Sequence, residues 1–268
     1  GQFGRIYETA EKKGGRSVAI KMLKGIVRGG AACGETPDAH MAEGFAREVE
    51  LLRDARLRHA NVVEYRGFGY IETECGQLGF IALELLRGTD LRVLMLKRKL
   101  GVDEALKWAA QLASALSCLH VCGVVHRDVK PSNCMILGDG TLKLIDFGLA
   151  IRLEGGHAAT TKYQSSQRLG VPGFMPPEVY RCEQYGAPVD VFAYGVVVHR
   201  MLWNAIPPGA CVSMRASWTR ALQELMPETF YASTCSPVTL TRVSLYIFDL
   251  DESSRASQQI YAGGAGSG

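Results

Sequence analysis

The sequence predicts an α+β fold in two lobes, because its local patterns change type near residue 86. Short apolar runs bounded by Gly-containing turns, typical of strands, occupy most of residues 1–86. Longer runs with helical spacing of apolar residues follow from residue 90 onward, whereas residues 211–244 show no clear helical pattern. We therefore expect a single domain over residues 1–268, with a small β-rich N-terminal lobe carrying one helix and a larger, mainly helical C-terminal lobe. Residues 263–268 are expected to form a flexible Gly/Ser tail.

The N-terminal lobe is expected to contain four strands and one helix. Apolar residues at 6–7 and 18–20 flank a polar, Gly-containing turn, which predicts a strand pair. Residues 24–44 are rich in Gly and Ala without a clear period and are expected to form a loop. Short strands are expected at residues 62–65 and 80–85. Residues 45–57 have helical spacing, with an apolar face formed by Phe45, Val49 and Leu52.

The C-terminal lobe is predicted to contain a long helix followed by a hairpin. Asp103 is a candidate N-cap for a helix that runs to Val121, and Gly123 ends it. Strands at residues 134–137 and 141–145 enclose the turn Gly-Asp-Gly, which predicts a β-hairpin. The buried stripe of the helix is expected to consist of Leu112, Ala115, Leu116 and Leu119.

Composition excludes several classes of protein. A hydrophobic share of 47% supplies enough apolar material for a packed core, and 21% charged residues argues against a disordered chain. The formal net charge is only +3, without a basic stripe, so we expect no nucleic-acid partner. The longest apolar stretch, residues 189–203, is interrupted by Asp190, His199 and Arg200. A membrane-spanning helix needs roughly 20 mainly apolar residues, so we expect no membrane span in this chain.

The eight cysteines have no spacing that predicts a disulfide framework or a metal site. No Cys-x-x-Cys occurs, and the closest pair, Cys118 and Cys122, lies one helical turn apart in an apolar helix. We expect buried, reduced thiols and therefore a cytoplasmic location.

Three motifs carry candidate chemistry, and the first is rich in glycine. Gly1-x-x-Gly4-x-Ile6 precedes Val-Ala-Ile-Lys at residues 18–21. A glycine turn between strands lets backbone N–H groups approach a phosphate, and Lys21 adds a positive charge nearby. Alone, two such glycines are equally typical of an ordinary hairpin, and Lys21 of a strand lysine with its ammonium group in solvent.

The second and third motifs place short carboxylate and amide side chains on loops. Residues 126–133 read His-Arg-Asp-Val-Lys-Pro-Ser-Asn, and Asp146-Phe-Gly follows Asp128 by 18 residues with the predicted hairpin between them. Asp128 is suited to accept a hydroxyl proton, and Asn133 and Asp146 to bind a hard divalent cation. Either motif alone would be typical of an Asx-capped turn, whereas their joint occurrence indicates a site.

Together and in this order, the motifs resemble the signature set of eukaryotic protein kinase catalytic domains, from Gly1 to about Ile260. The resemblance implies the two-lobed kinase fold, with Glu48 as ion-pair partner of Lys21 and Leu83 at the gatekeeper position. It also implies that the chain is truncated within the Gly-rich loop, whose middle glycine would be Gly1. Pro-Pro-Glu at 176–178 resembles the end of the activation segment.

The resemblance implies ATP and Mg²⁺ as cofactors and a protein as substrate. Asp128, Lys130, Lys21 and Glu48 would be catalytic, and Asn133 and Asp146 would bind the metal. The expected ATP-binding residues are Gly1, Gly4, Ile6, Ala19, Lys21, Glu84, Leu86, Asp90 and Met135.

Lys130 favours Ser and Thr over Tyr as phosphoryl acceptors in this family. Arg127 is a cation that would await a partner, so an upstream activating kinase is expected to act on Ser165 or Ser166. The alternative is that both serines are ordinary solvated loop residues. Arg255 is expected to pair with Glu178.

The alternatives are a pseudokinase, a small-molecule phosphotransferase and a dehydrogenase. Val171 stands where serine/threonine kinases usually have a threonine that links the catalytic Asp and Lys, which favours a pseudokinase that binds nucleotide without efficient transfer. The intact Lys21, Asp128, Asn133 and Asp146 argue against a pseudokinase. A small-molecule phosphotransferase should lack Lys130 and the Pro-Pro-Glu segment. A dehydrogenase is excluded because no helix starts at the glycines.

Overall fold

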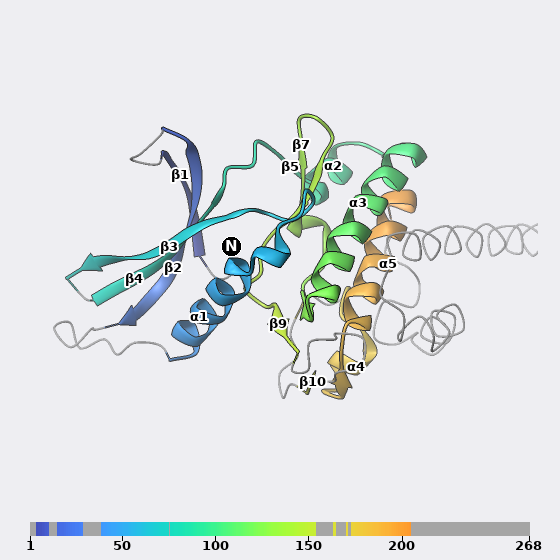
Figure 1. Ribbon diagram of the computed structural model, residues 1–268. Helices are drawn as coiled ribbons and strands as arrows, with labels where there is room; N and C mark the ends of the chain where they lie inside the picture. Colours follow the sequence, from blue (N-terminus) through green and yellow to red (C-terminus); the bar gives the residue numbers. More distant parts are fainter. Residues whose placement is uncertain are drawn as a thin grey trace, which may run out of the picture.

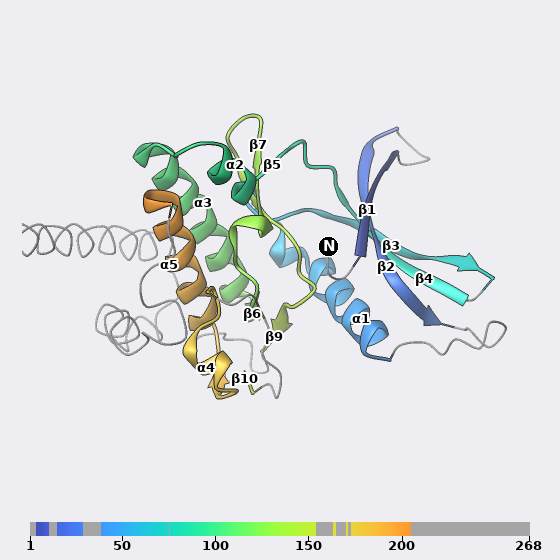
Figure 2. The same cartoon turned by 180° about the vertical axis from the view of Figure 1, so that it is seen from behind.

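The computed structural model describes residues 4–10, 15–28, 39–74, 76–153, 163–164, 170 and 173–204. A sheet and one helix lie at one end of the molecule, and the other helices lie at the opposite end (Figures 1 and 2). The predicted α+β fold in two lobes is confirmed. Within the described residues, no helix is both long and apolar enough to cross a membrane.

The N-terminal lobe is built on a four-stranded antiparallel sheet with strand order β1-β2-β4-β3. Ile6 pairs with Lys21, and Lys21 pairs in turn with Ile81, so these side chains share one face of the sheet. The strands are β1 (Gly4–Ala10), β2 (Ser17–Arg28), β3 (Tyr65–Thr73) and β4 (Gly76–Glu84).

Helix α1 (Ala39–Arg53) packs against this sheet through an aromatic cluster. The Phe45 ring centroid lies 6.2 Å from that of Phe68 and 5.8 Å from that of Tyr70, in edge-to-face geometry. A Cβ atom at Gly79 would lie 3.0 Å from the Phe45 ring, so the missing side chain at Gly79 lets the helix approach. The predicted apolar face is confirmed, because Phe45, Val49 and Leu52 are all buried.

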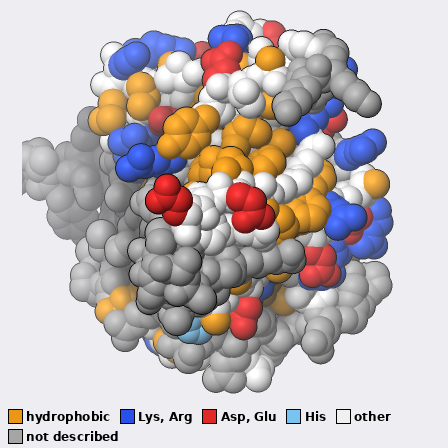
Figure 3. Space-filling view, turned by 90° about the vertical axis from the view of Figure 1, so that its left-hand side faces the viewer, with side chains coloured by type: hydrophobic (Ala, Val, Ile, Leu, Met, Phe, Trp, Pro, Cys, Tyr) orange, Lys and Arg blue, Asp and Glu red, His pale blue; other side chains and the backbone are white. Residues whose placement is uncertain are grey.

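Large hydrophobic side chains remain exposed on the N-terminal lobe. Figure 3, which faces this end of the molecule, shows hydrophobic side chains gathered among charged ones. Among the residues of this lobe whose side chains the structure describes, the exposed large hydrophobic ones are Ile6, Tyr7, Phe68 and Ile71. All four lie on β1 and β3, the two outer strands of the sheet.

Two sequence predictions for this lobe are wrong, because tertiary pairing overrides the local pattern. The predicted loop over 24–44 is too long: β2 continues to Arg28 by pairing with β4, and α1 already starts at Ala39. The predicted strand over 62–65 is replaced by a single parallel bridge between Val62 and Leu144 of the C-terminal lobe, and β3 starts only at Tyr65.

The C-terminal lobe is organised around two long helices that run side by side (Figures 1 and 2), α3 (Val102–Val121) and α5 (Pro188–Trp203). Asp103 is not the N-cap of α3, because the helix begins one residue earlier and Gly101 caps it. Asp103 instead lies in the first turn, where its negative charge favours the helix dipole. The predicted buried stripe is confirmed, with 0% exposure at Leu112, Ala115, Leu116 and Leu119.

The short strands of this lobe hold the loops that carry the second and third motifs. Residues 126–133 lie between β6 (Val124–Val125) and β7 (Cys134–Leu137), and Asp146 follows β8 (Leu142–Leu144). The predicted hairpin is confirmed as β7 paired with β8. The remaining elements are β5 (Gly88–Asp90), α2 (Leu91–Lys97), β9 (Ile151–Arg152), β10 (Tyr163–Gln164), α4 (Pro177–Tyr180), β11 (Gln184–Tyr185) and the 3-10 turns η2 (Ala55–Leu57) and η3 (Pro131–Asn133).

The predicted burial of the cysteines holds for two of the four in the part of the chain that the structure describes. Cys122 and Cys134 are buried, whereas Cys118 and Cys182 are partly exposed, and none of the four forms a disulfide within that part. Burial raises the pKa of the Cys134 thiol to about 12, so this thiol stays protonated at neutral pH.

Candidate active site

Lys21 forms the centre of an ion-pair cluster that joins three separate elements. Its Nζ lies 2.7 Å from Glu48 Oε1 on α1 and 2.7 Å from Asp146 Oδ1, which follows β8. Lys21 and Glu48 are 6% and 4% exposed, so solvent screens their attraction only weakly. The predicted partnership of Lys21 and Glu48 is therefore present in the structure.

The two carboxylates that share Lys21 have opposite pKa shifts. Burial raises the pKa of Glu48, and the attraction of Lys21 only partly offsets this rise. Burial also acts to raise the pKa of Asp146, but the charge of Lys21 and its hydrogen bond outweigh it and lower that pKa. For Lys21, burial acts to lower the pKa, whereas the two carboxylates raise it above its ordinary value. Asp146 is therefore the carboxylate better suited to stay ionised and bind a cation.

Asp128 lies at the centre of a second cluster, on the loop between β6 and β7. The side chain of Asp128 is almost buried, and its Oδ2 accepts a hydrogen bond from Lys130 Nζ at 2.6 Å. Asn133 Nδ2 donates both to Asp128 Oδ2 at 2.9 Å and to the Asp128 carbonyl oxygen at 2.8 Å. Because Nδ2 is occupied, Oδ1 is the atom of the Asn133 amide that can bind a metal.

Backbone and ring contacts connect the two clusters. The Ile145 N–H donates to the Asn133 carbonyl oxygen at 2.9 Å, which ties the residue before Asp146 to the loop of residues 126–133. Phe147 is 1% exposed, and its ring lies edge-to-face against His126 with a centroid distance of 5.1 Å. Asp146 adopts a left-handed backbone conformation with φ of 66°. Strain of this kind persists only where neighbouring contacts hold it, which is typical of functional sites.

Asp190 on α5 anchors the loop of residues 126–133 through its side chain, a role that the sequence analysis did not assign. The side chain of Asp190 is 0% exposed, and its carboxylate accepts hydrogen bonds from the backbone N–H groups of His126 and Arg127, both at 2.8 Å. His120 Nε2 lies 2.9 Å from the same carboxylate. The signal in the sequence was an aspartate in the first turn of an otherwise apolar helix, where a buried charge needs a specific partner.

Replacing this anchor is expected to destabilise the fold. Asp190→Asn leaves one acceptor oxygen for three donors, so we expect a loss of about 2 kcal/mol in the free energy of unfolding. Urea unfolding at pH 7 measures it, with the exposed turn residue Asp139→Asn as a control that should change stability by less than about 0.5 kcal/mol. Equal stability of the two variants would contradict the anchoring role.

The stabilisation of the fold by Asp190 should depend on pH. Burial acts to raise the pKa of Asp190, but the contacts with His120 and His126 outweigh it and lower that pKa below its ordinary value. The stabilisation is then present above about pH 4 and is lost as the pH falls through the folded-state pKa. The stability difference between wild type and Asp190→Asn should therefore shrink below about pH 4.

The candidate nucleotide-binding residues of the N-terminal lobe lie along the sheet. Ile6 is 61% exposed and lies opposite Lys21, Gly4 pairs with Leu23, and Ala19 pairs with Leu83 at the predicted gatekeeper position. Gly1 lies outside the described residues.

The segment between the lobes carries the other candidates. The Glu84 side chain accepts from Lys143 Nζ and from the Glu64 backbone N–H, both at 2.7 Å, so this side chain is already engaged. Within the described part of the chain, the Leu86 backbone N–H has no hydrogen-bond partner. Asp90 pairs with Met135 between β5 and β7 and caps α2 through Val93 N at 2.8 Å. Among the described residues, none bonds to Asp90 Oδ2, which leaves this atom for a ligand.

The activation segment is described only in part. Ser165, Ser166, Val171 and Arg255 lie outside the described residues, and so does the predicted pair between Arg255 and Glu178. The expectation that Arg127 awaits a partner is wrong. Its Nε donates to the Leu149 carbonyl oxygen at 2.6 Å, and a terminal nitrogen donates to the Tyr185 hydroxyl at 2.9 Å. Burial raises the pKa of Glu178.

Comparisons with known proteins agree with this geometry. The family model described as the protein kinase domain matches residues 1–257. The CBL-interacting serine/threonine-protein kinase 16 of Arabidopsis thaliana is 33% identical over 77% of this chain and 43% of its own length. The serine/threonine-protein kinase A of Synechocystis is 27% identical over 90% of this chain and 46% of its own length. An Aurora kinase of Schizosaccharomyces pombe is 30% identical over 77% of this chain and 53% of its own length.

The chain thus spans about half the length of the curated relatives it matches. The family model covers nearly the whole chain, and these relatives are named as protein kinases, two of them as serine/threonine kinases. The same chain places a lysine, its glutamate partner and the two loop motifs at one site between the lobes. The chain therefore belongs to the protein kinase family.

Proposed function

We propose that this domain transfers the γ-phosphoryl group of ATP to serine and threonine hydroxyls of protein substrates. The observation that carries the proposal is the shared ion pair in which Lys21 contacts both Glu48 and Asp146 at 2.7 Å. Phosphoryl transfer needs charge neutralisation and positioning more than covalent chemistry, and this cluster supplies placed charges from both lobes.

Lys21 is proposed to bind the α- and β-phosphates, with Glu48 holding its ammonium group in place. Ile6 and Ala19 would contact the base from the sheet, and the backbone of Glu84 and Leu86 would present hydrogen-bonding groups to its edge. Asp90 Oδ2 would meet the ribose. The free backbone N–H of Leu86 supports this assignment, because an adenine nitrogen is a matching acceptor.

Mg²⁺ fits the acceptors that the structure brings together. Asp146 has a lowered pKa and therefore stays ionised, and Asn133 presents Oδ1 because its Nδ2 is bound to Asp128. Carboxylate and amide oxygens are the ligands that this hard cation prefers. When bound, the ion would neutralise charge on the transferred phosphoryl group.

Asp128 is proposed to orient the acceptor hydroxyl and to accept its proton. The contact with Lys130 at 2.6 Å places a positive charge beside the site, where it would face the transferred phosphoryl group. Lys130 also supports serine and threonine as acceptors, through the resemblance of this loop to serine/threonine kinases.

The direct test is transfer of label from γ-labelled ATP with Mg²⁺ to casein, followed by phosphoamino-acid analysis. We expect phosphoserine and phosphothreonine, and no label when EDTA removes the metal. Phosphotyrosine would contradict the specificity. Nucleotide binding without transfer would favour the pseudokinase alternative, which Val171 raises.

An upstream kinase acting on Ser165 or Ser166 remains a separate proposal. The contact of Arg127 with the Leu149 carbonyl oxygen supports it, because Leu149 lies between Asp146 and Glu178 and a phosphate on this segment would offer Arg127 a charged acceptor. Active enzyme isolated from cells should carry phosphate on one of the two serines, as measured by mass spectrometry. Finding the whole segment unmodified in active enzyme would contradict the proposal.

A further inference from the structure

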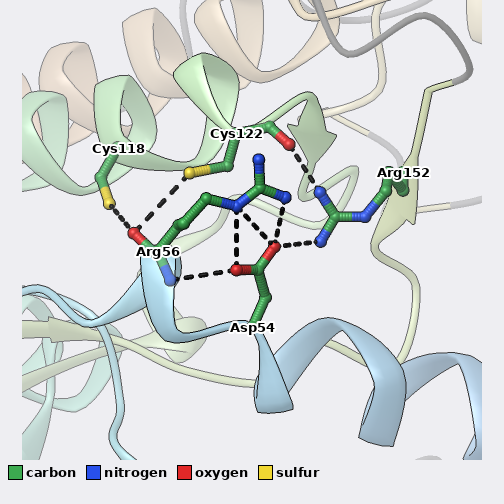
Figure 4. Close-up of polar contacts among 5 residues, drawn as sticks. All are labelled: Asp54, Arg56, Cys118, Cys122 and Arg152. Carbon is green, nitrogen blue, oxygen red and sulfur yellow. Dashed lines mark hydrogen bonds and ion pairs between the residues drawn. The ribbon is translucent and has the colours of Figure 1, made fainter.

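The side chain of Arg152 bridges the two lobes by contacting Asp54 and Cys122 (Figure 4). One terminal nitrogen of its guanidinium lies 2.7 Å from Asp54 Oδ2, and the other donates to the Cys122 carbonyl oxygen at 2.7 Å. Asp54 directly follows the last residue of α1, and Cys122 directly follows the last residue of α3. One planar group therefore joins the ends of a helix from each lobe.

Both ends of the bridge are close in sequence to residues of the site. Glu48, the partner of Lys21, lies on α1 and precedes Asp54 by six residues, and Asp146 precedes Arg152 by six residues. Strand β9, which carries Arg152, pairs with β6, and the Leu153 N–H donates to the Gly123 carbonyl oxygen at 2.9 Å. The position of Arg152 is thus fixed by the C-terminal lobe.

A second arginine on Asp54 provides an internal comparison. Arg56 binds the same carboxylate through Nε, a terminal nitrogen at 2.7 Å and its backbone N–H. Arg56 lies two residues from Asp54 on the same turn, so the bond between its side chain and Asp54 cannot hold α1 against the other lobe. Its carbonyl oxygen accepts from the Cys118 and Cys122 thiols at 3.5 and 3.7 Å, which seats the turn on α3.

Charge supports the bridge over a wide pH range. The hydrogen bonds from Arg56 and Arg152 outweigh burial and hold the pKa of Asp54 far below its ordinary value. The Asp54 side chain is 14% exposed and that of Arg152 is 32% exposed. A charge-assisted pair that is partly shielded, and whose guanidinium also binds a second acceptor, is stronger than a fully exposed surface pair.

We propose that Arg152 is a positioning residue for phosphoryl transfer, which holds α1 through Asp54 so that Glu48 meets Lys21. The inference rests on the proposed function, because it assigns Arg152 a role in the same reaction. Without the bridge, α1 would lose its charged contact with β9, and a smaller fraction of molecules would have Glu48 in place.

The test compares two arginine variants on the same carboxylate. Arg152→Gln is expected to lower kcat by roughly tenfold, since the charge-assisted bonds it removes are strong enough to shift a two-state equilibrium by that factor. Arg56→Gln is the matched control and should change kcat by less than about twofold. Asp54→Asn, which retains a capping side chain for η2, should reproduce the Arg152→Gln effect. Equal losses in the two arginine variants would overturn the proposal.

A double-mutant cycle separates positioning from general destabilisation. If Arg152 acts through Glu48, then Arg152→Gln should cost almost nothing further in a Glu48→Gln background. Independent effects would multiply, and that outcome would overturn the proposal.

A readout that needs no turnover keeps this inference distinct from the proposed function. Hydrogen exchange of residues 39–53 should be faster in Arg152→Gln than in wild type and unchanged in Arg56→Gln. If the wild type transfers no phosphate but this difference is present, the proposed function fails and the placement of α1 by Arg152 stands. Unchanged exchange in Arg152→Gln would overturn the positioning role.

Discussion

Asp128→Asn is expected to lower the rate of phosphoryl transfer by about 10²–10⁴-fold while the domain stays folded. The substitution keeps the size of a side chain that is 7% exposed, so packing should survive. It removes the negative charge of the carboxylate whose Oδ2 accepts hydrogen bonds from Lys130 Nζ at 2.6 Å and from Asn133 Nδ2 at 2.9 Å. An amide also cannot take the proton of the acceptor hydroxyl.

Initial rates with γ-labelled ATP and casein provide the measurement. Asp139→Asn is the matched control, because Asp139 is an exposed turn residue that accepts from the Thr141 N–H at 2.8 Å, and asparagine can do the same. This control should keep the wild-type rate within about twofold. Equal rates for wild type and Asp128→Asn would remove Asp128 from the reaction.

Lys21→Met is expected to have the second large effect, on both transfer and stability. Removing a charge that would bind phosphate should lower the rate by about 10²–10³-fold. The substitution also leaves Glu48, which is 4% exposed, without its cation and beside Asp146. Removing one partner of a buried pair typically costs about 3–5 kcal/mol in the free energy of unfolding.

A double variant distinguishes the two effects of Lys21. Lys21→Met combined with Glu48→Gln removes the unpaired buried charge, so most of the lost stability should return while transfer stays low. Urea unfolding measures the stability, and the exposed Lys97→Met serves as a control that should change neither property. Recovery of transfer in the double variant would contradict the role of Lys21.

The pH dependence of Lys21→Met gives a further check on the same pair. Burial already raises the pKa of Glu48 with Lys21 present, and removing Lys21 raises it further. A carboxyl with a raised folded-state pKa contributes stability below its unfolded pKa, and this contribution is lost as the pH rises through the folded-state pKa. The variant should therefore be more stable near pH 4 than at pH 7, relative to wild type.

Candidate site residues could be assigned from the sequence because short motifs contain them. Lys21, Asp128 and Asn133 sit in local patterns whose order along the chain indicates a kinase, and the structure brings them to the loops and strand expected. Contact between Glu48 and Lys21 depends on how α1 packs, which is decided by Phe45 against Gly79 and is not visible in any local pattern.

The sequence-based predictions were wrong where distant residues decide the structure. Residues 24–28 extend β2 because β4 offers a partner strand, and Val62 bridges to Leu144 instead of starting a strand. Asp54 and Arg152 are 98 positions apart and resemble ordinary surface charges in the sequence. Pairings of this kind follow from tertiary geometry, which periodicity and propensity do not contain.

The buried carboxylate of Asp190 fixes one part of the proposed active site to the C-terminal lobe, whereas the other part belongs to the N-terminal lobe and can move with it. Because Asp190 on α5 accepts hydrogen bonds from the backbone of His126 and Arg127, the loop that carries Asp128 and Asn133 is held against the C-terminal lobe. Lys21 and Glu48 belong to the sheet and helix of the other lobe. A rotation of one lobe against the other would therefore move Lys21 and Glu48 without disturbing Asp128 and Asn133. In the proposed reaction, such a hinge motion would change the position of the phosphates relative to Asp128, and it could control turnover while the loop of residues 126–133 keeps its structure.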